Sequence, residues 1–342
     1  MMKQYRIAFA GFRHAHIFDL YRRAQEHPRF AVAATCEEDV ANSLLPGKGM
    51  EPDFTSFAEM LDRTPCDVIA LGGCYGHRGE LALRALASGR HVIADKPLCI
   101  SLPEFERIEK AVWEGGGRVG LMLDLRDNAN LRTLREIIMS GVIGRVQTIA
   151  AAGQHPLLSG QRPAWYFQPG LHGGTINDIG IHLADLAPWL VGSAIDSVLA
   201  ARTWNSKARF APHFEDCAQF MLRLADGTGV LADVSYLAPD GCGYTNPDYW
   251  RIAVHGTGGM ASTSWNSGSV TVAGDADPEP RMVTSGPGRP GGYLEDFLGE
   301  LDGADRGHAL STSSCLAASR WALEIQTAAS PRSTPTGPVD HE

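Results

Sequence analysis

Residues 5–11, YRIAFAG, form a short and mostly apolar run that stops at a glycine. Residues 16–27 then carry apolar side chains at helical spacing, and residues 30–36, FAVAATC, form a second unbroken apolar run. A continuous apolar run is typical of a strand that is buried on both faces of a parallel sheet. Residues 5–36 therefore predict a β-α-β unit, which is the building block of a doubly wound fold.

The same alternation continues outward to about residue 123. Further strands are expected at residues 67–73, 91–95 and 118–123. Helices are expected near residues 57–63, 79–87 and 103–113. Strands separated by helices indicate a parallel sheet, and right-handed crossovers make residues 1–123 a doubly wound Rossmann domain.

Beyond residue 123 the pattern changes to consecutive strands joined by short polar turns, which indicates an antiparallel sheet. These strands are expected at residues 146–154, 195–204, 216–224, 229–237 and 250–256. Helices are expected at residues 131–140, 174–190 and 313–329, and a mobile loop is expected at the Pro- and Gly-rich residues 274–292. The predicted fold class is therefore α/β, with a second, α+β domain at residues 124–335 that contains an open, mainly antiparallel sheet.

Composition excludes several classes of protein. The chain has 342 residues and a formal net charge of −9, which argues against nucleic acid as a partner and against a polybasic membrane anchor. No apolar run approaches the roughly 18 residues of a membrane span. The strand pattern starts at the N-terminus and leaves no room for a signal peptide, so the expected location is the cytoplasm. The seven cysteines are scattered without a CxxC pair, so reduced thiols are expected, with no metal site and no disulfide framework.

The first strand-to-helix turn has the outline of a nucleotide site. Gly11-Phe12-Arg13-His14-Ala15-His16 occupies the place of a GxGxxG motif, but only the first glycine is present. The amides at the start of the helix still attract phosphate, and Arg13 either adds a charged contact or clashes with the ligand. Alternatively, Arg13 and the two histidines decorate a turn that faces solvent.

An acid after the second strand completes the dinucleotide pattern. Glu37 lies 21 residues past His16, where a carboxylate can accept both ribose hydroxyls and repel a 2′-phosphate. Glu38 and Asp39 follow, and no arginine stands nearby in the sequence, so NAD is favoured over NADP. The alternative is an acidic run that stabilises the dipole of the next helix.

Lys96 and Pro97 directly follow the strand expected at residues 91–95. In a doubly wound sheet the ligand crevice lies outside the carboxyl ends of the strands, so Lys96 is expected to point at it. A surface lysine at the end of a strand is the alternative.

Residues 173–192, GGTINDIGIHLADLAPWLVG, carry the second candidate for chemistry. At about 100° per residue, one polar stripe combines Asp178, His182, Asp185 and Trp189, which suggests a face that lines a cleft. Asp178 and His182 are i,i+4 neighbours, so a carboxylate is expected beside the imidazole, orienting it or sharing a ligand. The alternative is an exposed pair worth a few tenths of a kcal/mol.

Three motifs together resemble the Gfo/Idh/MocA oxidoreductases (glucose–fructose oxidoreductase, inositol dehydrogenase and relatives): IAFAGF at residues 7–12, ADKP at 94–97 and GG-x(3)-DIGIH at 173–182. The resemblance implies a bound NAD(P), an active site between the two domains and an open sheet that often forms an oligomer interface. It also implies that Lys96 and His182 form an acid/base pair and that Asp178 binds and orients the substrate.

The chain departs from the usual family pattern at two places besides the first turn. Relatives commonly carry a Thr-Pro-Asn stretch and a histidine after the fourth strand, whereas this chain has Gly72-Gly73-Cys74-Tyr75 and places Arg78 at the histidine position. The usual Glu-Lys-Pro is Asp95-Lys96-Pro97, a milder change. The first of these differences bears on the grip of the cofactor and leaves the acid/base set intact.

The expected function is an NAD-dependent dehydrogenase that oxidises a secondary alcohol of a sugar, polyol or related compound, or reduces the ketone. The expected catalytic residues are Lys96, Asp178 and His182. The residues expected to hold the cofactor are Gly11, Phe12, Arg13, His14, Glu37, Gly73, Cys74, Arg78, Asp95, Lys96 and Pro97. The residues expected along the substrate wall are His155, Arg162, Trp165, Tyr166 and His172, beside Lys96, Asp178 and His182.

Two other functions stay open at this point. One is a redox-neutral glycosidase or lyase that uses NAD through a transient keto-sugar, and the other is a non-catalytic regulatory protein that binds a nucleotide. A homodimer or homotetramer through the C-terminal sheet is expected in each case, because a bare apolar sheet face needs cover.

Overall fold

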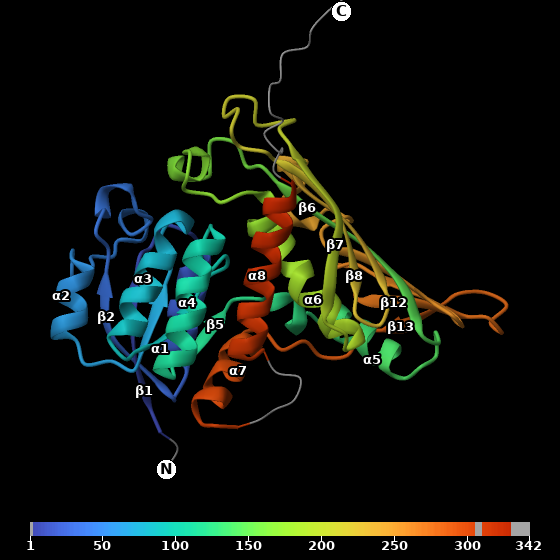
Figure 1. Ribbon diagram of the computed structural model, residues 1–342, viewed down its shortest axis with the longest axis horizontal. Coiled ribbons are helices and arrows are strands. Elements are labelled where there is room, and N and C mark those ends of the chain that lie inside the picture. Colours follow the sequence, from blue (N-terminus) through green and yellow to red (C-terminus); the bar gives the residue numbers. More distant parts are fainter. Residues whose placement is uncertain (1–2, 305–309, 330–342) are drawn as a thin grey trace, which may run out of the picture.

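Two β-sheets, with helices packed between them, make up the chain (Figure 1). The computed structural model describes residues 3–304 and 310–329. The end of the expected second domain, residues 330–335, lies outside this range. None of the described helices is long and apolar enough to cross a membrane.

The first sheet is parallel, as the sequence predicts, with the strand order β2-β1-β3-β4-β5. Its strands are β1 (Tyr5–Ala10), β2 (Phe30–Cys36), β3 (Val68–Leu71), β4 (His91–Ala94) and β5 (Val119–Leu121). The helices of this part are α1 (His16–Glu26), α2 (Phe57–Arg63), α3 (Tyr75–Ala87) and α4 (Leu102–Gly115). β1, β3 and β4 are almost completely buried, because helices cover both faces of the sheet.

Side-chain caps fix where several helices begin. Ser101 accepts a hydrogen bond from the Glu104 amide at the start of α4, and Gly116 ends that helix in the left-handed conformation. Asn128 accepts from the amides of Asn130 and Leu131 at the start of α5 (Ala129–Met139). These caps explain why the expected helix boundaries lie close to the observed ones.

The second sheet is mainly antiparallel, with the order β13-β12-β11-β10-β6-β9-β8-β7 and one parallel pair, β6 with β9. Its strands are β6 (Val146–Pro156), β7 (Ile195–Trp204), β8 (Cys217–Leu224), β9 (Gly229–Ala238), β10 (Arg251–Gly256), β11 (Gly259–Thr263), β12 (Ser269–Gly274) and β13 (Arg281–Thr284). Residues 274–292 are therefore wrongly predicted as wholly loop: β13 pairs with β12 there and forms the edge of the sheet.

The last two helices return to the first sheet. α7 (Gly292–Leu301) and α8 (Thr312–Ala329) pack against β5, and α8 also contacts α6 (Ile181–Val191) and β7 of the second half. Figure 1 shows α8 running between the two sheets. α8 is therefore a shared wall that fixes one half of the molecule against the other.

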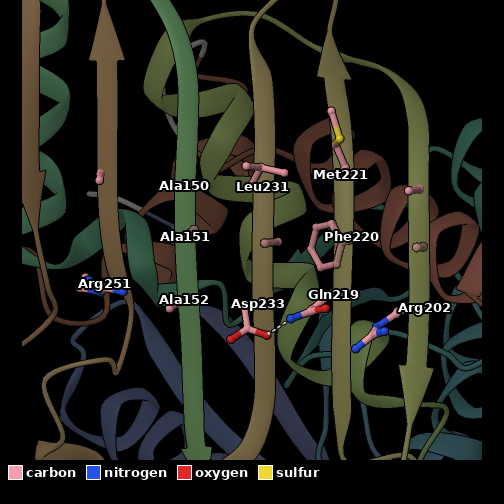
Figure 2. A pocket seen from close by; sticks show the side chains of 14 residues that line it. Ala150, Ala151, Ala152, Arg202, Gln219, Phe220, Met221, Leu231, Asp233 and Arg251 are labelled. Carbon is pink, nitrogen blue, oxygen red and sulfur yellow. Dashed lines mark hydrogen bonds between the residues drawn. The ribbon is translucent and has the colours of Figure 1, made fainter.

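The face of the second sheet that points away from these helices is open, and it combines apolar side chains with Gln219, Asp233 and two arginines. Figure 2 shows rows of alanines on it, with Leu231 and Met221 projecting from neighbouring strands. A shallow cavity of about 610 Å³ lies over these strands, and Asp233 accepts a hydrogen bond from Gln219 at its polar end.

Two glycines at the ends of β1 and β3, Gly11 and Gly72, leave no room for a side chain. The φ of Gly11 is +82°, and a Cβ there would lie 2.5 Å from the backbone nitrogen of Gly73. Gly72 is equally restricted, because its Cβ would lie 2.5 Å from the Cβ of Ile17 in α1. The ends of β1 and β3 and the start of α1 therefore meet backbone to backbone.

We predict that Gly11→Ala destabilises the protein more than the matched variant Gly89→Ala. Gly89 has a similar φ of +77° but open space at its Cβ, so its replacement should cost only the left-handed strain of about 1–2 kcal/mol. Gly11→Ala adds a backbone clash to that strain. Urea unfolding of both variants measures the difference, and equal losses of unfolding free energy would contradict the close approach of β1 and β3.

Candidate active site

A cavity of about 830 Å³ opens at the carboxyl ends of the first strands, within the roughly 300–1,000 Å³ that ligand sites usually have. Its walls come from the β1–α1 turn, residues 36–44, the first turns of α3 and residues 163–171. Both halves of the molecule therefore contribute to it, with Gly11, Gly73 and Cys74 on the first half.

Glu37 stands in the wall of this cavity as a buried carboxylate. Its Oε2 accepts a hydrogen bond of 2.6 Å from the Phe12 amide, and its Oε1 accepts one of 3.0 Å from the Asp39 amide. These amides hold the acid at the end of β2, where a ribose hydroxyl can reach it. The cavity and its acid thus fit the adenosine half of a dinucleotide.

The position of Arg13 differs from the expectation that no arginine lies near the acids that follow β2. No arginine is close to Glu37 in the sequence, but the structure brings Arg13 Nη1 to 3.8 Å from Glu37 Oε1 and to 2.9 Å from Asp39 Oδ2. The guanidinium is mostly buried and lies over the acids, so the turn does not present it to solvent as a decoration. Its carbonyl accepts from the Trp165 indole at 3.1 Å, which ties the turn to the second half.

Two histidines and an aspartate meet beside this turn. His14 Nδ1 lies 2.8 Å from Asp95 Oδ2, and His16 Nδ1 lies 2.9 Å from Asp95 Oδ1. Burial lowers the pKa of His14 to about 4. Burial also opposes the charged form of His16, yet the negative charge of Asp95 leaves the pKa of His16 raised.

Arg78 is completely buried, and the structure places it beneath the loops that bound the crevice. Its guanidinium donates to the carbonyls of Asp95 at 2.6 Å, Pro97 at 2.7 Å and Gly73 at 2.9 Å. The side chain therefore braces the loops that follow β3 and β4, rather than presenting its charge to the cavity.

Lys96 and Asp178 form a buried ion pair between the two halves. Lys96 Nζ donates to Asp178 Oδ1 at 2.6 Å and to the Asp178 carbonyl at 2.7 Å. The segment that carries Asp178 is fixed by Asn177, which donates to the Cys99 carbonyl at 2.9 Å, and by Ile176, whose amide donates to Gln326 of α8. The loop after β4, the Asp178 segment and α8 thus lock together.

Asp178 is also bonded from the side of the second sheet. Its Oδ2 accepts from the hydroxyls of Tyr166, at 2.6 Å, and Tyr236, and His172 Nε2 lies 3.4 Å away. Burial alone would raise the pKa of Asp178, but Lys96 and then His172 hold that pKa well below its usual range. Burial and Asp178 raise the pKa of Tyr236 well above its usual range, which keeps its hydroxyl proton available for donation.

His182 is placed differently from the sequence prediction. Residues 176–180 form a turn of π-helix before α6, so the assumed 100° per residue does not hold there. Asp178 is bonded to Lys96 and the tyrosines, while His182 Nδ1 has no hydrogen-bond partner and its ring packs on Trp250 at 5.3 Å. Burial, and then the charge of Lys96, hold the pKa of His182 well below its usual range, so the imidazole is neutral at pH 7.

The rest of the expected polar stripe lies outside the site. Asp185 is buried in a two-bond ion pair with Arg126, at 2.7 and 2.5 Å, and Trp189 packs under the guanidinium groups of Arg126 and Arg135. The prediction of one cleft-lining face from Asp178 to Trp189 is therefore wrong, because Asp178 and Asp185 pair with cations from different segments.

The five expected substrate-wall residues fall into four places. Trp165 lines the dinucleotide cavity, whereas Tyr166 and His172 belong to the hydrogen-bond network of Asp178. Arg162 donates to the carbonyls of Pro156 and Leu157 and stacks on the ring of Tyr166. His155 lies among the rings of Tyr236, Tyr244, Tyr249 and Trp250, and burial lowers its pKa to about 3.

Sequence reasoning missed Asp124 and Tyr236. Asp124 comes shortly after the end of β5, as Lys96 comes shortly after the end of β4, and that position was the available signal. Its side chain is exposed, yet burial raises its pKa, with the charges of His16 and Lys96 acting in the opposite direction. Tyr236, near the end of β9, gave no comparable signal.

Comparison with known proteins finds two family models that match successive parts of the chain. The family model described as "Oxidoreductase family, NAD-binding Rossmann fold" matches residues 6–122, and the model described as "GFO/IDH/MocA C-terminal domain" matches residues 131–262. The fold is similar to that of an inositol dehydrogenase homolog from Azotobacter vinelandii complexed with NAD⁺, with a TM-score of 0.77 over 96% of each chain. At 18% identity this likeness shows the fold alone.

Curated relatives match part of the chain. It is 32% identical over 139 residues to 1,5-anhydro-D-fructose reductase of Ensifer adhaerens, covering 40% of this chain and 41% of that protein. It is 27% identical over 188 residues to inositol 2-dehydrogenase 2 of Saccharopolyspora erythraea, covering 54% and 52%. The chain thus spans about half the length of these relatives. The two matching family models place it plainly: the chain belongs to the Gfo/Idh/MocA family of oxidoreductases.

Proposed function

We propose that the protein is an NAD-dependent oxidoreductase that acts on a secondary alcohol of a sugar, polyol or related compound. The observation that carries this proposal is the buried pair of Lys96 and Asp178, with the neutral imidazole of His182 within the same electrostatic neighbourhood. The names of the two curated relatives, an anhydrofructose reductase and an inositol dehydrogenase, favour the same substrate class.

We assign the cofactor to the 830 Å³ cavity and the turn beside it. Glu37 would hold the ribose, and Gly11 and Gly73 would let the backbone approach the diphosphate. Four acids, Glu37, Glu38, Asp39 and Glu80, outnumber the two arginines in that wall, Arg13 and Arg84, which favours NAD over NADP. When bound, the nicotinamide ring supplies a hydride acceptor or donor.

The protein's own groups would handle the proton. An ammonium has three donors, and Lys96 uses two of them on Asp178, so one remains for a substrate oxygen. That hydrogen bond stabilises negative charge on the oxygen, while the neutral imidazole of His182 accepts the hydroxyl proton. Asp178 holds the ammonium in place.

We also propose the division into a dinucleotide-binding unit at residues 1–123 and a substrate-binding and oligomerisation unit at residues 124–335. The protein would work as a homodimer or homotetramer through the open sheet face of Figure 2. Support comes from the exposed side chains of Leu199, Met221 and Leu231 around the alanine rows. All seven cysteines are free, in keeping with a reducing cytoplasm.

We predict that Lys96→Met abolishes turnover and spares NAD binding. Loss of the ammonium should lower kcat/KM by at least about 10²–10⁴, because the developing charge on the substrate oxygen is no longer stabilised. Absorbance at 340 nm with a panel of sugars and polyols measures turnover, and calorimetry measures NAD binding. The control is Lys110→Met, at an exposed lysine of α4.

Near-wild-type turnover of Lys96→Met would refute the role of Lys96. Product analysis separates the rival functions: a redox-neutral route converts substrate without stoichiometric NADH, and a regulatory protein binds NAD but converts no member of the panel.

We predict that Leu231→Arg weakens self-association at least about tenfold. A charge placed in the centre of an apolar interface is left without a partner, at a cost of about 1.4 kcal/mol or more. Sedimentation velocity over a concentration series measures the effect. Trp113→Arg, at an exposed position on α4, should leave the oligomer unchanged. An unaltered oligomer in Leu231→Arg would remove this face from the assembly.

A further inference from the structure

Three groups that commonly bind metal ions converge at the start of α1. They are the imidazoles of His14 and His16 and the carboxylate of Asp95, and one ligand atom of each lies within 4.8 Å of the others. His14 and His16 stand two residues apart across the first turn, and Asp95 reaches them from the end of β4. The imidazole rings of His14 and His16 are nearly perpendicular, with an interplanar angle of 85°, and the Nδ1 atom of each ring faces the Asp95 carboxylate.

Hydrogen bonding within the cluster accounts for only one of the two contacts. His16 Nδ1 and Asp95 Oδ1 form a hydrogen bond of 2.9 Å. His14 Nδ1 and Asp95 Oδ2 lie 2.8 Å apart, yet each is buried without a hydrogen-bond partner, because the contact lacks the required direction. Buried polar atoms are rarely left unsatisfied, and one ion bound between these two adjacent atoms would satisfy both.

The charges around the cluster suit a cation. Arg78 Nη2 lies 3.5 Å from Asp95 Oδ2, and Arg78 Nη1 donates to the Asp95 carbonyl, so the guanidinium orients the carboxylate as an outer-shell partner does. Asp124 and Lys96 act electrostatically on His16, with opposite signs. Lys96 is already paired with Asp178, so Asp95 and Asp124 outnumber the remaining cation, Arg78, and the surroundings do not repel a divalent ion by net charge.

We propose that His14, His16 and Asp95 bind a divalent first-row transition ion such as Zn²⁺ or Fe²⁺. Two imidazoles and one carboxylate are a recurrent donor set for these ions, and three protein ligands leave a coordination position open. The side chain of His16 is 50% exposed, which gives the ion a path of entry from the cleft.

This proposal departs from the expectation of no metal site, which was based on the spacing of the cysteines. The site contains no cysteine, and its carboxylate lies 79 residues beyond His16 in the sequence. The proposal stands independently of the dehydrogenase function, because binding of the metal can be measured without cofactor or substrate.

The test uses full-length protein without a histidine tag, stripped with a chelator. Calorimetric titration with Zn²⁺ should give one ion bound per chain, and Co²⁺ should develop the visible absorption bands of a protein-ligated ion. Removal of an outer-shell partner already costs about 10–100-fold in metal affinity, so His16→Ala should lose at least that much. His255→Ala removes an exposed histidine of β10 and should bind like the wild type.

The absence of stoichiometric Zn²⁺ binding in the wild type would overturn the proposal, whatever the variants do. Wild-type affinity in His16→Ala, or an equal loss in His255→Ala, would also overturn it. His16 is half-exposed, so His16→Ala should keep its fold, which thermal melting checks.

Discussion

The buried ion pair of Lys96 and Asp178 is the constraint on which the two halves of the molecule depend. Neither charge can leave water without heavy cost unless a partner meets it, and each comes from a different sheet region. The cost is offset by the hydroxyls of Tyr166 and Tyr236, which complete the shell of the carboxylate. The same buried ion pair therefore holds the two halves together and places Lys96 for the proposed chemistry.

The first turn lacks the second and third glycines of the GxGxxG motif, and glycines at the ends of β1 and β3 explain how its parts still pack closely. In the usual turn the third glycine lets the helix pack closely, but here Gly72 at the end of β3 gives Ile17 that room. Gly11 likewise gives room to the backbone of Gly73. Positions 13 and 16 are thereby freed for larger side chains, which the chain uses for an arginine over the acidic wall and for a histidine beside Asp95.

Sequence patterns predicted the parallel sheet, because it follows from the alternation of strands and helices and from burial on both faces. They failed where one local period was assumed. The π-helical turn at residues 176–180 separates Asp178 from the stripe of α6, so its partners are Lys96 and the tyrosines. Contacts between distant segments, such as Arg13 with Asp39 or Asp178 with Tyr236, leave no spacing signal at all.

A double-mutant cycle on Lys96→Met and Asp178→Leu, followed by urea unfolding, tests the central claim most directly. Breaking a buried pair from either side leaves one uncompensated charge and should cost about 3–5 kcal/mol of unfolding free energy. If the two side chains form a buried pair, the double variant leaves no lone charge and should lose no more unfolding free energy than either single variant. Additive losses would show that the two side chains do not interact and would contradict the account.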